Sequence, residues 1–176
     1  MKRILLMMTL ALFAATVAFA QSDWNSEMKK DVVDIAIGSE DHTTLVAAVK
    51  AAGLVETLKG EGPFTIFAPT NAAFKALPDG TVPMLLKEEN KDKLTAILTY
   101  HVVAGNLDST AVVEAIQQGN GTAAVETLQG GTLTAMLKDG KVYLEDENGN
   151  TAQVTAVDLQ GSNGVIHVIN SVVMPE

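Results

Sequence analysis

Hydrophobic and polar positions follow two different periods along this chain, and the change of period divides the sequence into two parts. From Asp31 to Gly119, apolar residues recur at helical spacing, as Leu45, Val49 and Ala52 illustrate. From Ala123 to Val173, the segments are short, rich in β-branched residues and bounded by turn residues, which is typical of strands. The pattern therefore predicts an α+β fold in which helices cover the apolar face of an antiparallel strand meander.

Within the first part, capping and turn residues delimit several short helices. Asp41 is expected to cap a helix that ends at Gly53, and Asp108 or Ser109 is expected to cap the last helix. Two runs of β-branched and aromatic residues interrupt these helices and predict strands. The expected helices lie within residues 31–53, 71–76, 82–98 and 108–119, and the expected strands span residues 64–67 and 100–103.

The second part predicts a meander of short strands. The Asp139-Gly140 and Asn148-Gly149 dipeptides favour tight hairpins, because both can adopt positive φ angles. Apolar residues occupy both faces of the last strand, so it is expected at the centre of a sheet, buried on each side, with His167 in the interior. The expected strands are Ala124–Leu128, Thr132–Lys138, Lys141–Glu145, Ala152–Leu159 and Val165–Asn170.

The first 20 residues have the features of a signal peptide that is cleaved near Ala20. A basic start precedes an uncharged apolar run, and small residues stand at its last and third-last positions. The run is slightly shorter than the roughly 20 residues of a membrane span, so a retained anchor is the less favoured alternative. We expect export to the periplasm or the extracellular space. Residues 21–30, which include Trp24, are expected to form a lead-in segment, and residues 31–175 a single domain.

Charge and composition narrow the classes of function. The sequence has 21 acidic and 12 basic residues; two of the basic ones lie in the leader, so the remaining chain carries a net charge of −11 and no arginine. This balance disfavours nucleic acid and anionic lipid surfaces as partners. Because the chain has no cysteine, disulfides, thiolate nucleophiles and cysteine-ligated metals are excluded. Core packing is therefore expected to hold the domain together.

Candidates for catalysis are weak. The three histidines, His42, His101 and His167, have no second histidine at ligand spacing. His42 is expected to be solvated, and the other two are expected to be interior histidines within apolar strands. The segment Gly161–Gly164 is one residue short of a nucleophile elbow and joins two strands instead of a strand and a helix. The sequence thus predicts no enzyme activity and no cofactor.

Two other segments could take a metal ion or a modification. In Glu145–Asn150, alternating Asp and Asn residues match the start of a calcium loop. The glycine and the glutamate that such a loop requires are replaced by Thr151 and Val157, which favours a solvated hairpin tip without metal. Asn120 begins an Asn-Gly-Thr triplet, which is a glycosylation signal.

Three segments together resemble the fasciclin domain, a family of secreted cell-adhesion and matrix modules. The first is Phe64–Phe74, the second is the Tyr100-His101 pair, and the third is Asn163–Asn170, which leads to a Val-Met-Pro ending. The similarity extends from about Asp31 to Pro175. The signature residues in the first and third segments are Phe64, Phe67, Pro69, Thr70, Asn71, Phe74, Asn163, Gly164 and His167.

The resemblance implies a wedge of two small, mostly antiparallel β-sheets covered by a layer of short helices. It also implies a non-enzymatic module that binds a cell-surface or matrix protein or a polysaccharide. We expect the chain to be a monomer. In animal members of the family, a tyrosine–histidine pair and an acidic–aliphatic pair are linked to integrin binding. Tyr100 and His101 match the first pair, and Asp158 and Leu159 stand in the place of the second. A leader before one cysteine-free domain indicates a bacterial protein, so an integrin is not the expected partner.

Physical reasoning predicts structural roles for some of the same residues. Asn71 follows the first strand, and its side chain is expected to cap the next helix. A buried histidine needs a hydrogen-bond partner, so His101 or His167 is expected to bond into the loop after Phe67 and to fix its shape.

An alternative hypothesis is an exported small-ligand-binding or weakly hydrolytic protein. Its cleft would be lined by Tyr100, His101 and Asn71. A solvent-open pocket that contains His101 would favour this hypothesis, and a buried His101 would argue against it.

Overall fold

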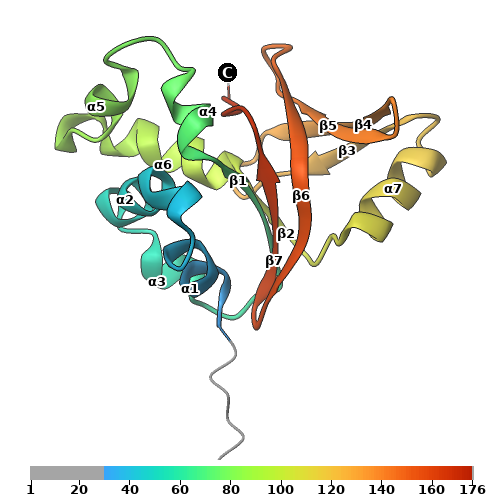
Figure 1. Ribbon diagram of the computed structural model, residues 1–176, viewed down its shortest axis with the longest axis horizontal. Helices are drawn as coiled ribbons and strands as arrows, with labels where there is room; N and C mark the ends of the chain where they lie inside the picture. Colours follow the sequence, from blue (N-terminus) through green and yellow to red (C-terminus); the bar gives the residue numbers. More distant parts are fainter. Residues whose placement is uncertain (1–29, 176) are drawn as a thin grey trace, which may run out of the picture.

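Strands from both parts of the sequence join in one seven-stranded sheet. The computed structural model describes residues 30–175 (Figure 1); the expected leader and the residues 21–29 with Trp24 lie outside this range. β1 and β7 pair in parallel, and the other neighbours pair antiparallel. In spatial order the strands are β2 (Val102–Ala104), β1 (Phe64–Pro69), β7 (Gly164–Ile169), β6 (Thr151–Gly161), β5 (Lys141–Glu145), β4 (Thr132–Lys138) and β3 (Thr122–Glu126).

The sheet curves until its two edge strands almost meet. Val103 of β2 bridges to Thr127, just beyond β3, and Leu128 donates a backbone hydrogen bond to the Val102 carbonyl at 2.7 Å. The expected division into two small sheets is not confirmed, because β6 belongs to both halves: its start pairs with β5 and its remainder with β7. The α+β class and the antiparallel meander from β3 to β7 are confirmed.

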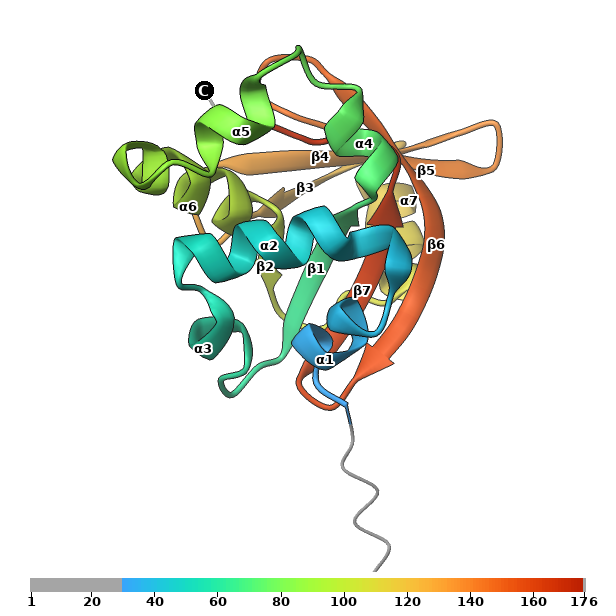
Figure 2. The ribbon, with the colours of Figure 1, turned by 60° about the vertical axis from the view of Figure 1, so that its left-hand side comes forward.

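The helices lie on both sides of the central strands β1 and β7. In Figures 1 and 2, the helices α1 to α6 gather on one side and α7 lies on the other, and the outline narrows toward the turn between β6 and β7. Among residues 30–175, none of the helices has the length and apolar character that crossing a membrane requires. The helices are α1 (Val32–Ile37), α2 (Thr43–Ala52), α3 (Val55–Leu58), α4 (Asn71–Lys75), α5 (Thr81–Leu85), α6 (Lys91–Tyr100) and α7 (Ser109–Gln118), with 3-10 turns at Glu40–His42 and Glu88–Asn90.

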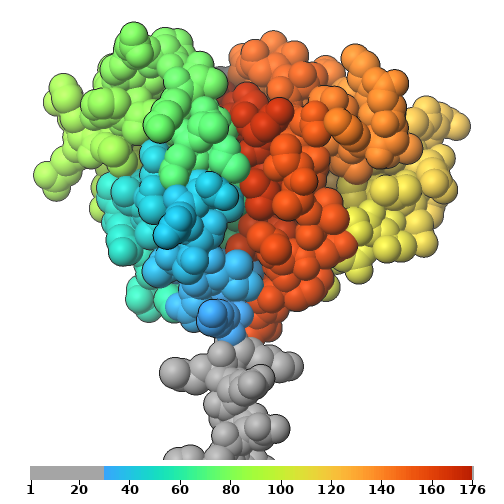
Figure 3. All heavy atoms as spheres, in the orientation of Figure 1, coloured from blue at the N-terminus to red at the C-terminus, as the bar shows by residue number. Residues whose placement is uncertain are grey.

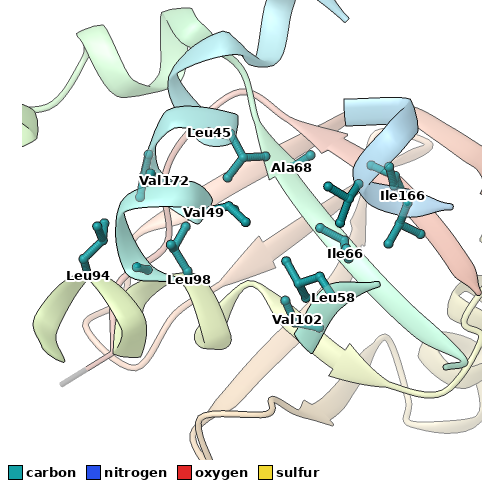
Figure 4. Packing of buried hydrophobic residues seen from close by; sticks show 14 of the residues in the cluster. Leu45, Val49, Leu58, Ile66, Ala68, Leu94, Leu98, Val102, Ile166 and Val172 are labelled. Atoms are coloured by element: carbon teal, nitrogen blue, oxygen red, sulfur yellow. The ribbon is translucent and has the colours of Figure 1, made fainter. Parts of the chain in front are cut away.

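Two cores form because β1 and β7 bury both faces. Ile66 and Ile166 face the helix-side core, where α2 and α6 contribute leucine and valine side chains (Figure 4). Phe67 and Ile169 face the inner core, which all seven strands line and which α7 closes. Every residue of β7 is buried, so the prediction of a central strand with two apolar faces is confirmed. Figure 3 shows the helical half and the sheet half meeting along one boundary on this face.

The ends of the helices agree only in part with the sequence. Asp108 caps α7 by accepting from the Ala111 N–H at 2.8 Å, and Gly53 ends α2 with a φ of 75°, as expected. Asp41 is not the cap of α2, because it lies within the preceding 3-10 turn and α2 begins at Thr43. His42 is buried, with Nδ1 2.8 Å from the hydroxyl of the nearby Ser39, so the expectation of a solvated side chain is wrong.

The predicted strand at residues 100–103 is also shorter than expected. Tyr100 is the last residue of α6 and His101 its carboxyl-terminal cap, so β2 begins only at Val102. The β-branched and aromatic residues favour a strand locally, but Leu94 and Leu98 of α6 pack in the helix-side core. This packing stabilises the helix up to Tyr100. As a result, the side chains of Tyr100 and His101 project from the carboxyl end of α6 and not from a strand.

Candidate functional site

Tyr100 lies inside the protein at the carboxyl end of α6. Its side chain is fully buried. The hydroxyl donates to the Thr132 carbonyl at 2.8 Å and accepts from the Glu147 backbone N–H at 3.3 Å. Burial raises the pKa of this phenol. Tyr100 therefore joins α6 to the start of β4 and to the loop that follows β5.

His101 is fixed by hydrogen bonds at both ring nitrogens. Nδ1–H donates to the Ile97 carbonyl at 2.8 Å, and Nε2 accepts from the Val173 backbone N–H at 3.3 Å. This arrangement requires the neutral ring, and burial lowers the pKa of His101 to about 4. Because the basic nitrogen already accepts from the main chain, His101 is not placed to take a proton from a substrate. It instead ties α6 to the carboxyl-terminal segment.

Asp158 and Leu159 lie in an irregular part of β6. Asp158 has a positive φ of 59°, in a stretch where the pairing with β7 shifts register. Its carboxylate accepts from the backbone N–H of Ser109 at 2.8 Å and from the Ser109 hydroxyl, and the hydroxyl bond lowers the pKa of Asp158. Asp158 thus holds the first residue of α7 against β6, whereas Leu159 is 38% exposed.

His167 is buried in the middle of β7, and its ring bonds to the main chain of β6 and of the loop before α7. Its Nε2–H donates to the Leu107 carbonyl at 2.7 Å, and Nδ1 accepts from the Asp158 backbone N–H at 3.4 Å. The ring also stacks on Phe67, with 5.7 Å between ring centroids. The expectation that His101 or His167 bonds into the loop after Phe67 is therefore wrong, because the nitrogens of both rings have main-chain partners elsewhere.

The signature segment Phe64–Phe74 joins β1 to α4 and also braces α2. Thr70, and not Asn71, caps α4, because the Thr70 hydroxyl accepts a backbone N–H of that helix at 3.3 Å. The Asn71 amide oxygen accepts from the Thr44 N–H at 2.9 Å, and its NH₂ group donates to the Glu40 carbonyl at 2.8 Å. Asn71 therefore satisfies the start of α2, a helix distant in sequence, which no local capping rule could predict.

Asn163 connects three separate elements at the turn between β6 and β7. Its amide oxygen accepts from the Val32 N–H at 3.1 Å, and its NH₂ group donates to the carbonyls of Leu58 at 2.8 Å and Gly60 at 3.1 Å. The next residue must be glycine, because a Cβ atom at Gly164 would stand 2.1 Å from the carbonyl oxygen of the neighbouring strand β1. The Asn-Gly signature thus joins β7, α1 and α3.

The Glu145–Asn150 loop is organised by Asp146, which is buried. Its carboxylate accepts backbone N–H groups from Asn148 at 3.0 Å, Asn150 at 2.8 Å and Met174 at 3.0 Å. These bonds close the hairpin loop onto the carboxyl-terminal segment. Within residues 30–175, no cluster of three or more Asp, Glu or His side chains is arranged to hold a metal ion. The possible glycosylation residue Asn120 is exposed in the turn after α7.

The residues of the alternative ligand cleft do not share one hollow. His101 touches a narrow apolar cavity of about 40 Å³ beneath α1 and α2. Asn71 lines a separate surface hollow of about 250 Å³ with Thr44 and Phe74, between α2, α4 and α5. Tyr100 lines neither of them. The structure therefore separates the three side chains on which the alternative hypothesis depends.

A larger polar hollow lies at the narrow end of the molecule. We name it the tip cleft; it measures about 520 Å³ and is lined by Lys59–Pro63, Asn106 and Gln160–Gly164. Sequence reasoning does not reveal it, because three loops far apart in the chain contribute to it. The glycine and proline residues of these loops predict turns, but they do not predict that the three turns lie next to one another.

Comparisons with known proteins agree with this architecture. The fasciclin domain family matches residues 40–175. The chain is 54% identical to the protein sll1483 of Synechocystis, over 82% of this chain and 73% of that protein. It is 38% identical to the pig transforming growth factor-beta-induced protein ig-h3, over 82% of this chain but only 19% of that protein.

Similarity of fold extends to a solved structure with low sequence identity. A FAS1 domain pair from the insect cell adhesion molecule Fasciclin I superposes with a TM-score of 0.61 at 20% identity, covering 74% of this chain and 43% of that one. At this identity the match concerns the fold alone. Together with the family match over residues 40–175, it leads to one conclusion: the chain belongs to the fasciclin domain family.

Proposed function

We propose that this chain is an exported, non-enzymatic adhesion module that binds a partner at the cell surface or in the surrounding matrix. The observation that carries the proposal is the engagement of His101 and His167, the two histidines of the family's signature segments, by the main chain. Each ring donates from one nitrogen and accepts at the other, so neither offers a free basic nitrogen for catalysis. The solved insect structure comes from a cell adhesion molecule, which supports the same class of function.

The negative charge of the chain limits the kinds of surface to which it can adhere. A net charge of −9 for the full sequence disfavours general attraction to anionic surfaces, so adhesion is expected to depend on a local and specific contact. We propose that the module acts as a monomer. Size-exclusion chromatography with light scattering should then give the mass of one chain at micromolar concentration, and a dimer would contradict this part of the proposal.

A retention experiment tests the adhesive function. Residues 21–176 are immobilised and exposed at low salt to purified envelope proteins and to cell-wall polysaccharide fractions. The proposal predicts saturable retention of at least one component, which the soluble protein displaces by competition. Failure to retain any component would contradict the adhesive function, and turnover of ester or glycoside substrates would contradict its non-enzymatic character.

Export is tested separately from adhesion. Expression of the full sequence in a bacterial host with a secretion pathway should yield a mature protein that begins at Gln21, as mass spectrometry of the intact chain can show. A product that retains Met1 and stays with the membrane fraction would instead indicate the uncleaved anchor.

A further inference from the structure

We infer that the tip cleft binds a short stretch of neutral polysaccharide. The inference rests on the proposed adhesive function, for which it names the contact site and the class of partner. The cleft lies between the loop that joins α3 to β1, the loop after β2 and the turn between β6 and β7. The turn between β6 and β7 lies at the narrow end of the ribbon in Figure 1. Its volume of about 520 Å³ falls within the range of about 300–1,000 Å³ found for ligand sites.

The walls of the tip cleft are held in place by hydrogen bonds. The Asn163 side chain fixes one wall to α1 and α3, as described above. The Gly105 N–H donates to the Pro63 carbonyl at 2.9 Å, and the Ser162 N–H donates to the Lys30 carbonyl at 3.0 Å. All three loops are therefore bonded to neighbouring segments, so a ligand would have little ordering cost to overcome.

The side chains that line the cleft offer neutral hydrogen-bonding groups. Asn106, Gln160 and Ser162 are exposed, and their side chains form no hydrogen bond with another group in residues 30–175. An amide presents two donors and an acceptor, and a hydroxyl presents both roles. Neighbouring hydroxyl groups of a sugar ring present donors and acceptors in the same way, so a polyhydroxylated ligand matches this lining.

The charges around the cleft argue against an anionic ligand. The Lys59 ammonium group is already paired with the carboxylates of Asp31 at 3.0 Å and Asp34 at 2.8 Å. Glu61, the other charged residue of the lining, would repel a phosphate or a uronic acid. The neutral side chains of Asn106, Gln160 and Ser162 then favour an uncharged ligand. Pro63 and the glycines of the lining provide apolar surface for the C–H groups of such a sugar.

The lining also sets the expected strength of binding. It contains no aromatic ring on which a sugar could stack. Affinity then comes from solvent-exposed hydrogen bonds, and a dissociation constant in the millimolar range is expected. Retention on a polysaccharide surface would depend on many repeats of the same unit, because rebinding to neighbouring repeats raises the apparent affinity.

The test is a titration of residues 21–176 with short neutral oligosaccharides of glucan, mannan and galactan type, followed by NMR or calorimetry. At least one should bind, and the double variant Asn106→Ala with Gln160→Ala should weaken that binding about tenfold or more. The control is the double variant Gln117→Ala with Gln118→Ala, which removes two exposed amides from α7 and should bind like the wild type. All variants should melt within about 2 °C of the wild type.

The outcomes separate this inference from the proposed function. Absence of binding to every neutral oligosaccharide, equal affinity of the cleft variant and the wild type, or preference for an anionic oligosaccharide would each overturn the inference. If the immobilised protein still retains an envelope protein, the adhesive function stands without the tip cleft. If it retains nothing at all, the adhesive function itself fails.

Discussion

The signature residues and the tip cleft use their polar side chains in opposite ways. Tyr100, His101 and Asn163 direct every polar side-chain atom toward main-chain groups. Asn106 and Gln160 extend similar groups from loops into solvent. The residues by which this family is recognised thus hold the fold together, whereas the proposed binding groups, Asn106 and Gln160, lie outside the signature, one of them beside the turn that contains Asn163.

The largest effect is expected for His101→Ala. The change removes two hydrogen-bonding groups and leaves a cavity beside the carboxyl-terminal segment, so the free energy of unfolding should fall by about 3–4 kcal/mol. The melting temperature should fall by roughly 10 °C, measurable by circular dichroism. A melting temperature within about 2 °C of the wild type would show that His101 has no structural role.

The buried His101 should also make stability depend on pH. Burial lowers its pKa from 6.5 to about 4, so between these values the unfolded chain binds a proton that the folded protein does not. The free energy of unfolding should therefore decrease by about 3 kcal/mol as the pH falls from 6.5 to 4.

Burial also lowers the pKa of His42, so a variant is needed to isolate the contribution of His101 to the pH dependence of stability. Urea unfolding of the wild type and of His101→Gln is compared at several pH values, because the contribution of His42 is common to both. The loss of stability toward acid pH should be smaller in the variant. Parallel curves for the two proteins would refute the assignment.

A smaller loss is expected for Asn163→Ala. The variant leaves the Val32 N–H and the carbonyls of Leu58 and Gly60 without their partner, at a cost of about 2–3 kcal/mol in the free energy of unfolding. Asn106→Ala removes the same amide from an exposed loop of the same end and should change this free energy by less than about 0.5 kcal/mol. If the two variants lost the same free energy of unfolding in urea, the proposed difference between the bonded amide of Asn163 and the exposed amide of Asn106 would be wrong.

The smallest structural effect is expected for Tyr100→Phe. The ring keeps its packing, but the Thr132 carbonyl and the Glu147 N–H lose the hydroxyl, which should cost about 1–2 kcal/mol. Tyr143→Phe is the matched control, because its hydroxyl bonds only to the partly exposed Gln153 side chain at 3.3 Å. Tyr143→Phe should lose clearly less free energy of unfolding in a thermal melt than Tyr100→Phe. A larger loss in Tyr143→Phe would contradict the structural role of Tyr100.

The sequence predicts the fold of this protein better than the contacts of its polar residues. The strand Thr132–Lys138, its hairpin partner and the doubly buried β7 follow from period and turn chemistry, which are local properties. The single curved sheet does not follow from them, because it depends on where the two halves of β6 pair. Register across distant strands is a tertiary property.

The same limit applies to the candidate site. Burial of His101 and His167 is predictable from their apolar surroundings, but their partners are not. The bonds from His101 to Val173 and from Asn71 to Thr44 join residues far apart in sequence, so spacing rules cannot find them. The tip cleft cannot be predicted from the sequence for the same reason, since it exists only after three loops meet.

The most direct test measures stability and binding side by side in two variants. Tyr100→Phe and the double variant Asn106→Ala with Gln160→Ala are unfolded in urea and titrated with the neutral oligosaccharide that the wild type binds best. Tyr100→Phe should lose about 1–2 kcal/mol in the free energy of unfolding but bind the oligosaccharide like the wild type. The double variant should keep its stability and lose about tenfold or more in affinity. The reverse pattern, with binding lost in Tyr100→Phe and retained in the double variant, would contradict the account.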